Sequence, residues 1–381
     1  MTAIDPIELS QALIRCESVT PEDAGALDVL QAALEELGFV CQRHVFTEDG
    51  TPDVDNLYAR LGTASPNICY AGHTDVVPIG DVAAWSVAPF GADIKEGVLY
   101  GRGAVDMKPA IAAFVAAVAQ LVHERGTLAG SISFLITGDE EGPAINGTKK
   151  LLDVITAQGE VLDHCIVGEP TNPAKLGEMA KIGRRGSVNG VLRVNGVQGH
   201  AAYPENAENP VPGMLNLLKV LDGLALDQGN AHFQPSNLEI TSIDVGNTAH
   251  NVIPAQASAK FNVRFNSEHS GDSITALLRE SLAAANVAHE LDLHVTGESF
   301  LCPPGKLSDL TTAAVEKVLG ITPELSTTGG TSDARFIKDY CSLIEFGLIN
   351  EMAHKVDENI AVADVQALAE IYTEILRGYF S

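Results

Sequence analysis

The chain has 381 residues, 45% of them hydrophobic, and 24 basic against 50 acidic side chains give it a net charge of −26. The length favours two domains with a sizeable core, and the acidic balance excludes nucleic acid and an anionic membrane surface as partners, because both require a basic face. Six cysteines form no CxxC pair, and the N-terminal residues lack the basic start and long apolar run of a signal peptide. We therefore expect reduced thiols and a cytoplasmic protein.

The first half of the chain alternates predicted helices and strands. Apolar residues at helical spacing predict helices over Ile4–Cys16, Ala24–Leu37, Met107–Arg125 and Ala144–Ala157. Short runs rich in β-branched or aromatic residues predict strands over Phe39–Phe46, Asn56–Leu61, Asn67–Ala71, Ser131–Thr137 and Asp163–Val167. This alternation is typical of an α/β fold in which helices cover both faces of a sheet with a parallel core.

The predicted order of elements changes between residues 186 and 297. Strands are predicted over Ser187–Val197, Leu238–Val245, Ala259–Phe265 and Leu291–Val295, and helices over Val211–Leu226 and Ser273–Val287. The resulting order, β-α-β-β-α-β, is the split βαβ arrangement. Apolar and polar residues alternate strictly within Ala259–Phe265, which predicts a sheet with one buried and one polar face.

The alternation of predicted helices and strands resumes after residue 298. A helix over Ser308–Leu319, a strand over Ser342–Phe346 and a helix over Val362–Tyr379 are predicted there, with a Gly/Thr-rich loop over Thr327–Ser332. We therefore predict a catalytic domain formed by residues 1–185 and 298–381. Residues 186–297 would form a smaller domain inserted into it.

Two adjacent carboxylates, Glu140 and Glu141, follow the uncharged run Ser131–Thr137. Open α/β sheets hold their ligands at the carboxyl ends of such strands. Because neighbouring residues in extended chain point to opposite sides, one glutamate is free to bind a metal while the other faces a substrate. Taken alone, the pair fits a solvated acidic turn better than a catalytic site.

Four further motifs place ligand-type side chains near predicted strand ends. GHTDVVP holds His73 and, two residues on, Asp75, which is placed to orient the His73 ring. GRGAVDMK places Asp106 before a helix, GEPT places Glu169 after a strand, and MAHK places His354 after a strand and a turn. Each has an ordinary explanation when taken alone: a turn histidine, a helix N-cap aspartate, a proline turn and a surface histidine.

Together the motifs offer five oxygen or nitrogen ligands and no cysteine, namely His73, Asp106, Glu141, Glu169 and His354. Carboxylate and imidazole ligands suit zinc and similar divalent ions. A single catalytic zinc uses three protein ligands, so five fit two metals about 3.5–4 Å apart that share one carboxylate.

With these motifs the chain resembles the di-zinc aminoacylase/carboxypeptidase superfamily over nearly its whole length. The segments that carry the resemblance are GHTDVVP, GRGAVDMK, ITGDEEGPAINGTKK, VGEPT, GRRGS, GHAAYPENAENP, GGTSDARF, FGLIN and HKVDE. The resemblance implies a zinc-exopeptidase-like mixed sheet with helices on both faces. It also implies an inserted ferredoxin-like domain through which the protein forms a homodimer.

The resemblance further implies two Zn²⁺ per subunit, with Co²⁺ able to substitute. Asp106 would bridge the ions, His73 and Glu169 would complete one site, and Glu141 and His354 the other. Glu140 would be the general base, and Asp75 would orient His73.

Other matching positions imply how a small anionic substrate is held. His200 of GHAAYP would reach the active site of the partner subunit and help hold the oxyanion, and Asn251 would cross over similarly. The remaining positions that would hold substrate are Arg184, Ser187, Tyr203, Arg264, Gly330, Thr331 and Asn350.

Within the superfamily, GDEEG together with GRRGS and GGTSD is most similar to the enzymes that remove succinate from N-succinyl-LL-2,6-diaminopimelate in lysine and diaminopimelate biosynthesis. In such a reaction Glu140 would take a proton from water and return it to the leaving amine. One alternative is an N-acetylornithine deacetylase or a broader aminoacylase. An alternative from another class is a catalytically inactive, metal-binding dimeric module.

Overall fold

The computed structural model describes residues 4–381, so the first three residues of the predicted catalytic domain lie outside it. The chain divides into two compact units. Unit 1 comprises the described residues up to Ile182 together with Cys302–Ser326 and Ser332–Ser381, and unit 2 comprises Gly183–Leu301 and Thr327–Thr331. The loop segment Thr327–Thr331 groups with unit 2, whereas the sequence analysis assigned it to the catalytic domain.

A mixed eight-stranded sheet runs through unit 1. Its strands, in spatial order, are β1 (Val40–Phe46), β2 (Val54–Leu61), β6 (Ser131–Thr137), β3 (Asn67–His73), β7 (His164–Val167), β18 (Ser342–Glu345), β8 (Met179–Lys181) and β17 (Glu324–Ser326). The four central strands β6, β3, β7 and β18 pair in parallel, while β1, β2 and β6 pair antiparallel. The predicted mixed sheet with a parallel core is confirmed.

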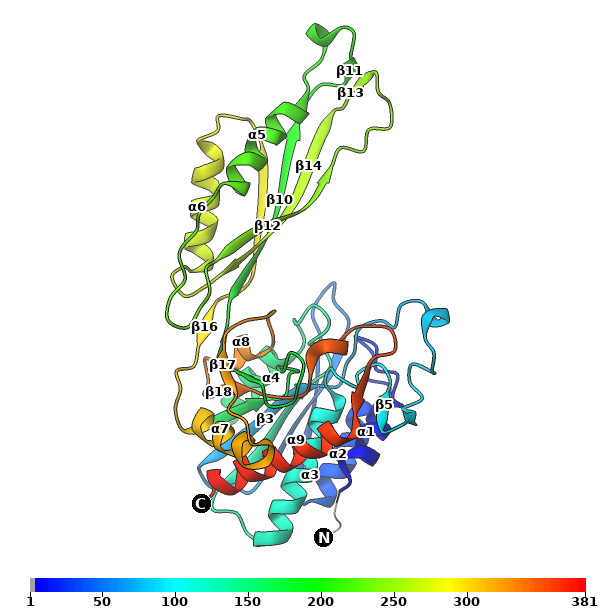
Figure 1. Ribbon diagram of the computed structural model, residues 1–381, viewed down its shortest axis with the longest axis vertical. Helices are drawn as coiled ribbons and strands as arrows, with labels where there is room; N and C mark the ends of the chain where they lie inside the picture. The colour runs from blue at the N-terminus through cyan, green and yellow to red at the C-terminus, as the bar shows by residue number, and fades with distance from the viewer. Residues whose placement is uncertain (1–3) are drawn as a thin grey trace. The chain divides into compact units, whose positions relative to one another are not determined.

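Helices lie on both faces of this sheet, as Figure 1 shows for α3 and α9 on one side and α4 on the other. The helices of unit 1 are α1 (Pro6–Ile14), α2 (Ala26–Glu36), α3 (Lys108–Arg125), α4 (Thr148–Ala157), α7 (Lys306–Leu319), α8 (Ala334–Ile337) and α9 (Val362–Tyr379). Helix α3 is apolar almost all round and packs against α1, α9 and β3. A helix of that composition belongs in a core, and no helix within residues 4–381 has the length and apolar character needed to cross a membrane.

The register of the parallel strands decides where ligand-type side chains meet. His73, the last residue of β3, pairs with Thr137, the last residue of β6. Ala71 of β3 pairs with Val167, the last residue of β7. Because all three strands end at the same edge, the residues that follow β6 and β7 emerge beside His73.

The predicted helix over 144–157 begins only at Thr148. The preceding loop turns on Asp139, whose carboxylate accepts hydrogen bonds from the backbone N–H groups of Ile145 and Asn146. Ala144 has a φ of 55°, a left-handed backbone conformation that a helix does not contain. The prediction of a helix from residue 144 is therefore wrong by one turn.

Several short strands carry too little pattern to be predicted. In unit 1 they are β8, β17, β4 (Ile94–Lys95), β5 (Val98–Tyr100) and β19 (Asn359–Ala361). The last three form a small sheet in which β19 pairs with β5. This sheet joins the segment before α3 to the segment before α9.

Unit 2 contains a four-stranded antiparallel sheet with helices on one face (Figure 1). The elements in chain order are β10 (Gly186–Asn195), α5 (Pro210–Asp222), β12 (Asn237–Asp244), β14 (Gln256–Phe265), α6 (Gly271–Ala283) and β15 (Glu290–Gly297). The spatial order of the strands is β12-β14-β10-β15. The element order and the one-sided burial agree with the predicted split βαβ arrangement.

Two glycines of β10 make room for aromatic rings of β14. Gly186 pairs with Phe265 and Gly190 with Phe261, and a side chain at either glycine would overlap the opposite ring. Both rings are buried beneath the helices.

The chain enters and leaves unit 2 through adjacent segments. Strand β9 (Gly183–Arg184) pairs with β16 (Phe300–Leu301) within unit 2. In unit 1, the N–H of Cys302 donates to the carbonyl of Ile182 at 2.7 Å.

Candidate metal centre

The five side chains predicted as metal ligands lie together in unit 1. Asp106 Oδ1 lies 3.1 Å from His73 Nε2, and Asp106 Oδ2 lies 3.3 Å from His354 Nε2. The two oxygens of one carboxylate therefore face two different imidazoles. Glu169 Oε1 is 3.8 Å from His73 Nε2, and Glu141 Oε1 is 2.8 Å from His354 Nε2.

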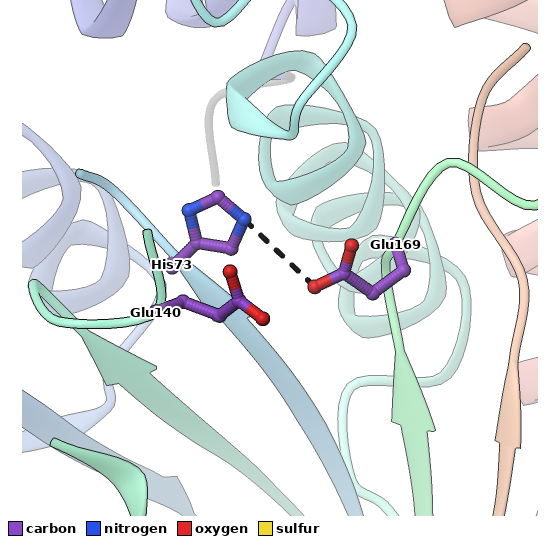
Figure 2. Close-up of side chains that lie close together, drawn as sticks. All are labelled: His73, Glu140 and Glu169. Carbon is purple, nitrogen blue, oxygen red and sulfur yellow. Dashed lines mark ion pairs between the residues drawn. The ribbon is translucent and has the colours of Figure 1, made fainter. Parts of the chain in front are cut away.

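Figure 2 shows how His73 at the end of β3 faces Glu140 and Glu169, which come from the loops after β6 and β7. Ligand atoms of these three residues lie within 4.8 Å of one another, and the same holds for His73, Asp106 and Glu141. Spacing alone does not separate Glu140, the predicted base, from the predicted ligands.

The donor set fits a divalent metal. It combines imidazole nitrogens with carboxylate oxygens from separate loops, the ligands that zinc and similar ions take in proteins. A carboxylate whose oxygens point to different histidines also suits a bridge between two ions. The residues present therefore fit the metal chemistry predicted from the sequence.

The carboxylates of this cluster shift the pKa values of the two histidines among them. Burial alone would lower the pKa of His73, but hydrogen bonds to Asp106 and Asp75 raise it well above its ordinary value. Hydrogen bonds to Asp106 and Glu141 raise the pKa of His354 to about 10. Burial alone would raise the pKa of Asp106, but hydrogen bonds from His354 and His73 hold it below its ordinary value. The cluster therefore needs positive charge to offset its carboxylates.

The pKa of Glu140 shifts in the opposite direction to that of Asp106. Burial, followed by the neighbouring charge of Glu169, raises the pKa of Glu140 well above that of an ordinary glutamate. A carboxylate with a raised pKa is a stronger base than an ordinary glutamate.

Asp75 contacts both the His73 ring and the turn that carries Glu140 and Glu141. The His73 ring nitrogen Nδ1 lies 2.9 Å from the backbone oxygen of Asp75 and 3.5 Å from its Oδ1. The Asp75 carboxylate accepts hydrogen bonds from the N–H groups of Glu140, at 3.3 Å, and Glu141, at 3.0 Å. Asp75 thus holds the His73 ring largely through its backbone, and its carboxylate holds the turn that carries the two glutamates.

Two local interpretations of the sequence differ from the structure: extended chain at Glu140 and Glu141, and a helix cap as the ordinary explanation of Asp106. Glu140 and Glu141 lie in a turn rather than in extended chain, so their separation comes from the turn that Asp75 holds. Asp106 is not a helix cap, because the residue that caps α3 is Met107 and Asp106 faces the histidines instead. His354 comes after strand β18 and a segment that contains Gly347, as predicted, with the 3₁₀ helix η3 (Asn350–Met352) just before it and a φ of 62°.

Most residues predicted to hold substrate belong to unit 2, where some of them are neighbours. Arg184 Nη1 donates to the carbonyl oxygen of Gly330 at 3.0 Å, and Thr331 follows Gly330 in the chain. Ser187 of β10 pairs directly with Arg264 of β14. Burial lowers the pKa of the half-buried Arg264 guanidinium. Arg184 lies two residues before β10, and the first residues of β10 pair with the end of β14 that carries Arg264.

A second group in unit 2 surrounds His200. His200 lies on β11 (Gly199–His200), which pairs with β13 (Val252–Ile253), and its ring centroid lies 5.7 Å from that of Tyr203. The backbone oxygen of Asn251 accepts a hydrogen bond from Ala201. All three side chains are exposed, so they are available to another molecule.

Asn350 is the predicted substrate residue that belongs to unit 1. Its side-chain amide donates to the carbonyl of Pro170 at 3.1 Å, directly after Glu169 in the chain. Asn350 therefore lies next to the candidate metal centre. Its role, like those of the other substrate residues, stays a prediction.

A family model described as "Peptidase family M20/M25/M40" matches residues 69–378. A protein of Rhodospirillum centenum is 59% identical over 379 residues, which cover 100% of this chain and 98% of that protein. A protein of Caulobacter vibrioides is 56% identical, with 100% of this chain and 97% of that protein covered. Both relatives are named succinyl-diaminopimelate desuccinylase.

Solved structures show the same fold at low sequence identity. An M20 family metallo-carboxypeptidase of Sulfolobus solfataricus matches with a TM-score of 0.81 at 17% identity, covering 98% of this chain and 99% of the other. A tripeptidase of Staphylococcus aureus matches with a TM-score of 0.78 at 18% identity, covering 99% of both chains. The predicted zinc-exopeptidase-like α/β fold is confirmed, while the dimerising role of the inserted domain stays a prediction.

Gly168 leads to a first testable prediction. A Cβ atom at Gly168 would overlap the hydroxyl of the buried Tyr70, so Gly168→Ala must displace the end of β7 that carries Glu169. We expect zinc affinity to fall by about 10–100-fold, the usual effect of disturbing the support of a metal ligand. Competition with a chromogenic chelator would measure it.

Gly305→Ala is the matched control, because a Cβ there meets no atom closer than 3.9 Å. Equal zinc affinities of the two variants would show that the Gly168 contact does not position Glu169.

Proposed function

The chain belongs to peptidase family M20/M25/M40, and from this premise we propose that it hydrolyses N-succinyl-LL-2,6-diaminopimelate to succinate and LL-2,6-diaminopimelate. The observation that carries the proposal is full-length identity of 54–59% to relatives named succinyl-diaminopimelate desuccinylase. The position of Glu140 beside the candidate metal ligands supports it. The reaction belongs to lysine and diaminopimelate biosynthesis, and we place it in the cytoplasm.

The centre would hold two zinc ions per subunit, with cobalt able to replace them. His73 and Glu169 would hold one ion, Glu141 and His354 the other, and Asp106 would bridge them. The distances from the two Asp106 oxygens to His73 and His354 support this division. When bound, such ions lower the pKa of water and polarise the substrate carbonyl.

Glu140 carries the proton in the proposed reaction. Its carboxylate accepts a proton from the attacking water and then returns it to the leaving nitrogen, so a single residue serves both steps. The raised pKa of Glu140 suits this role, because the proton must stay on the carboxyl group between the steps. Asp75 keeps the carboxylate in place by holding the Glu140 N–H.

The substrate carries three carboxylates, and the chain as a whole is strongly acidic. Local positive charge is therefore needed to bind it. Arg184 and Arg264 offer guanidinium groups that can pair with carboxylates through two parallel hydrogen bonds. Ser187, Tyr203, Gly330, Thr331 and Asn350 would complete the contacts.

The substrate assay is the direct test of the proposed function. We expect zinc-loaded protein to release succinate from succinyl-diaminopimelate, and a chelator to abolish the release until zinc is restored. Because N-acetylornithine lacks the succinyl carboxylate, sites that bind that group are left unpaired, and kcat/KM for it should be lower by at least about 100-fold. Parallel assays of both substrates measure the ratio.

Two outcomes would contradict this expectation. A higher kcat/KM for N-acetylornithine would make the protein a deacetylase. Substrate binding without hydrolysis by the zinc-loaded protein would favour the inactive metal-binding module.

Glu140→Gln removes the proposed base and preserves the shape of the side chain. We expect kcat to fall by about 10²–10⁴-fold, the usual contribution of general acid–base catalysis. Zinc content, measured by elemental analysis, should not change, because Glu140 is proposed as a base and not as a ligand. Turnover close to that of the unmodified protein would remove Glu140 from this role.

A homodimer formed through unit 2, in which His200 serves the partner's site, makes a separate prediction. His200→Ala and Glu140→Gln proteins should each be inactive alone. Mixing and reassembling them yields heterodimers with one site that has both residues, so activity should return to about one quarter of normal if subunits pair at random. If His200 acts within its own subunit, mixing the two variants restores no activity.

A further inference from the structure

A buried ion pair lies behind the candidate metal centre in unit 1. Arg102 Nη1 and Glu358 Oε2 are 2.5 Å apart, and the side chains are 3% and 0% exposed. The two residues are 256 positions apart in the sequence. Neither is among the residues predicted as ligands, base or substrate contacts.

Glu358 holds the backbone that carries Asp106. Its second oxygen, Oε1, accepts hydrogen bonds from the N–H groups of Val105, at 2.8 Å, and Asp106, at 3.2 Å. The backbone oxygen of Glu358 also accepts a hydrogen bond from Gly101. The loop before α3 is therefore fixed by the Glu358 residue at both of its ends.

Arg102 holds the loop that carries His354. Its guanidinium donates to the carbonyl oxygens of Lys355 at 3.3 Å and His354 at 3.5 Å. His354 has a φ of 62°, a left-handed backbone conformation that is uncommon for a residue with a side chain. The hydrogen bonds from Arg102 help to hold the backbone in this conformation.

The same guanidinium reaches a third segment. Arg102 Nη2 donates to the carbonyl of Pro78 at 3.3 Å, and the guanidinium carbon lies 5.3 Å from the centre of the Trp85 ring. The Trp85 indole in turn donates to the carbonyl of Ile79. Pro78 follows the segment that contains His73 and Asp75, so the ion pair connects three ligand-bearing segments.

We propose that Arg102 and Glu358 are positioning residues that hold Asp106 and His354 in the geometry needed to bind metal. A buried ion pair is a poor way to stabilise a core, because apolar residues of similar size often do as well. Its directed hydrogen bonds, however, fix backbone positions that apolar packing cannot. The inference deepens the proposed metal centre and rests on it.

Glu358→Gln tests the inference. The amide keeps the size and one acceptor oxygen but removes the negative charge that faces Arg102. We expect zinc affinity to fall by about 10–100-fold, as is usual when the outer support of metal ligands is removed. The loss should be greater for the ion held by His354. Titration of metal-free protein with zinc against a chromogenic chelator gives both affinities.

Denaturant unfolding of the metal-free protein provides the second measurement. A merely structural pair would change the free energy of unfolding and leave the zinc affinity of the folded protein unchanged. Glu160→Gln is the matched control, because Glu160 pairs with Arg60 and Tyr58 of β2 in the same unit, and within residues 4–381 no hydrogen bond joins its carboxylate to a ligand-bearing loop. This control should bind zinc as the unmodified protein does.

Arg102→Lys keeps the positive charge but cannot reach all the carbonyl oxygens at once. We expect a smaller loss of zinc affinity than for Glu358→Gln. If Glu358→Gln fails to fold, Arg102→Lys is the alternative test of the inference. Normal zinc affinity in a folded variant of either residue would overturn the inference while leaving the proposed function intact. If the unmodified protein bound no divalent metal, the proposed function and the inference would both fail.

Discussion

The carboxylate of Asp106 is the group on which the rest of unit 1 depends. One of its oxygens faces His73 and the other faces His354, residues that lie 281 positions apart in the chain (354 minus 73). The parallel strands β6, β3 and β7 bring three of the ligand-bearing loops to one edge of the sheet. The loops before α3 and before β19 bring the other two. No segment forms the centre alone, so the ligands meet only where β3, β6 and β7 are paired.

Placing so many acidic groups together is unfavourable unless positive charge accompanies them. In the structure, hydrogen bonds to the carboxylates outweigh the effect of burial and raise the pKa values of both histidines, which favours protonated rings beside the carboxylates. A divalent ion fills the same need and competes with those protons. The raised pKa of Glu140 has the same origin, because burial and the charge of Glu169 both disfavour its ionised form.

The long periodic elements were predictable, and so was the set of ligand-type residues. Helix α3 and strand β6 have strong apolar patterns, and the residues at strand ends follow from the rule that open sheets bind ligands there. Short strands such as β8 and β19 were missed because three residues carry no period. The hydrogen bonds from Glu140 and Glu141 to Asp75 join segments 65 and 66 positions apart, which no local pattern indicates. Arg102 and Glu358 were missed for the same reason, since a charged residue in a loop ordinarily predicts solvent exposure.

The way the chain passes through unit 2 has a consequence for how such proteins diversify. Strands β9 and β16 pair side by side, and Ile182 and Cys302 remain hydrogen-bonded neighbours where the chain leaves and rejoins unit 1. A module attached at two adjacent points can be enlarged, trimmed or exchanged by recombination without changing the path of the polypeptide elsewhere. Natural variation can then act on the inserted module while the surrounding sheet, whose strand register places the ligand-type residues together, is inherited unchanged.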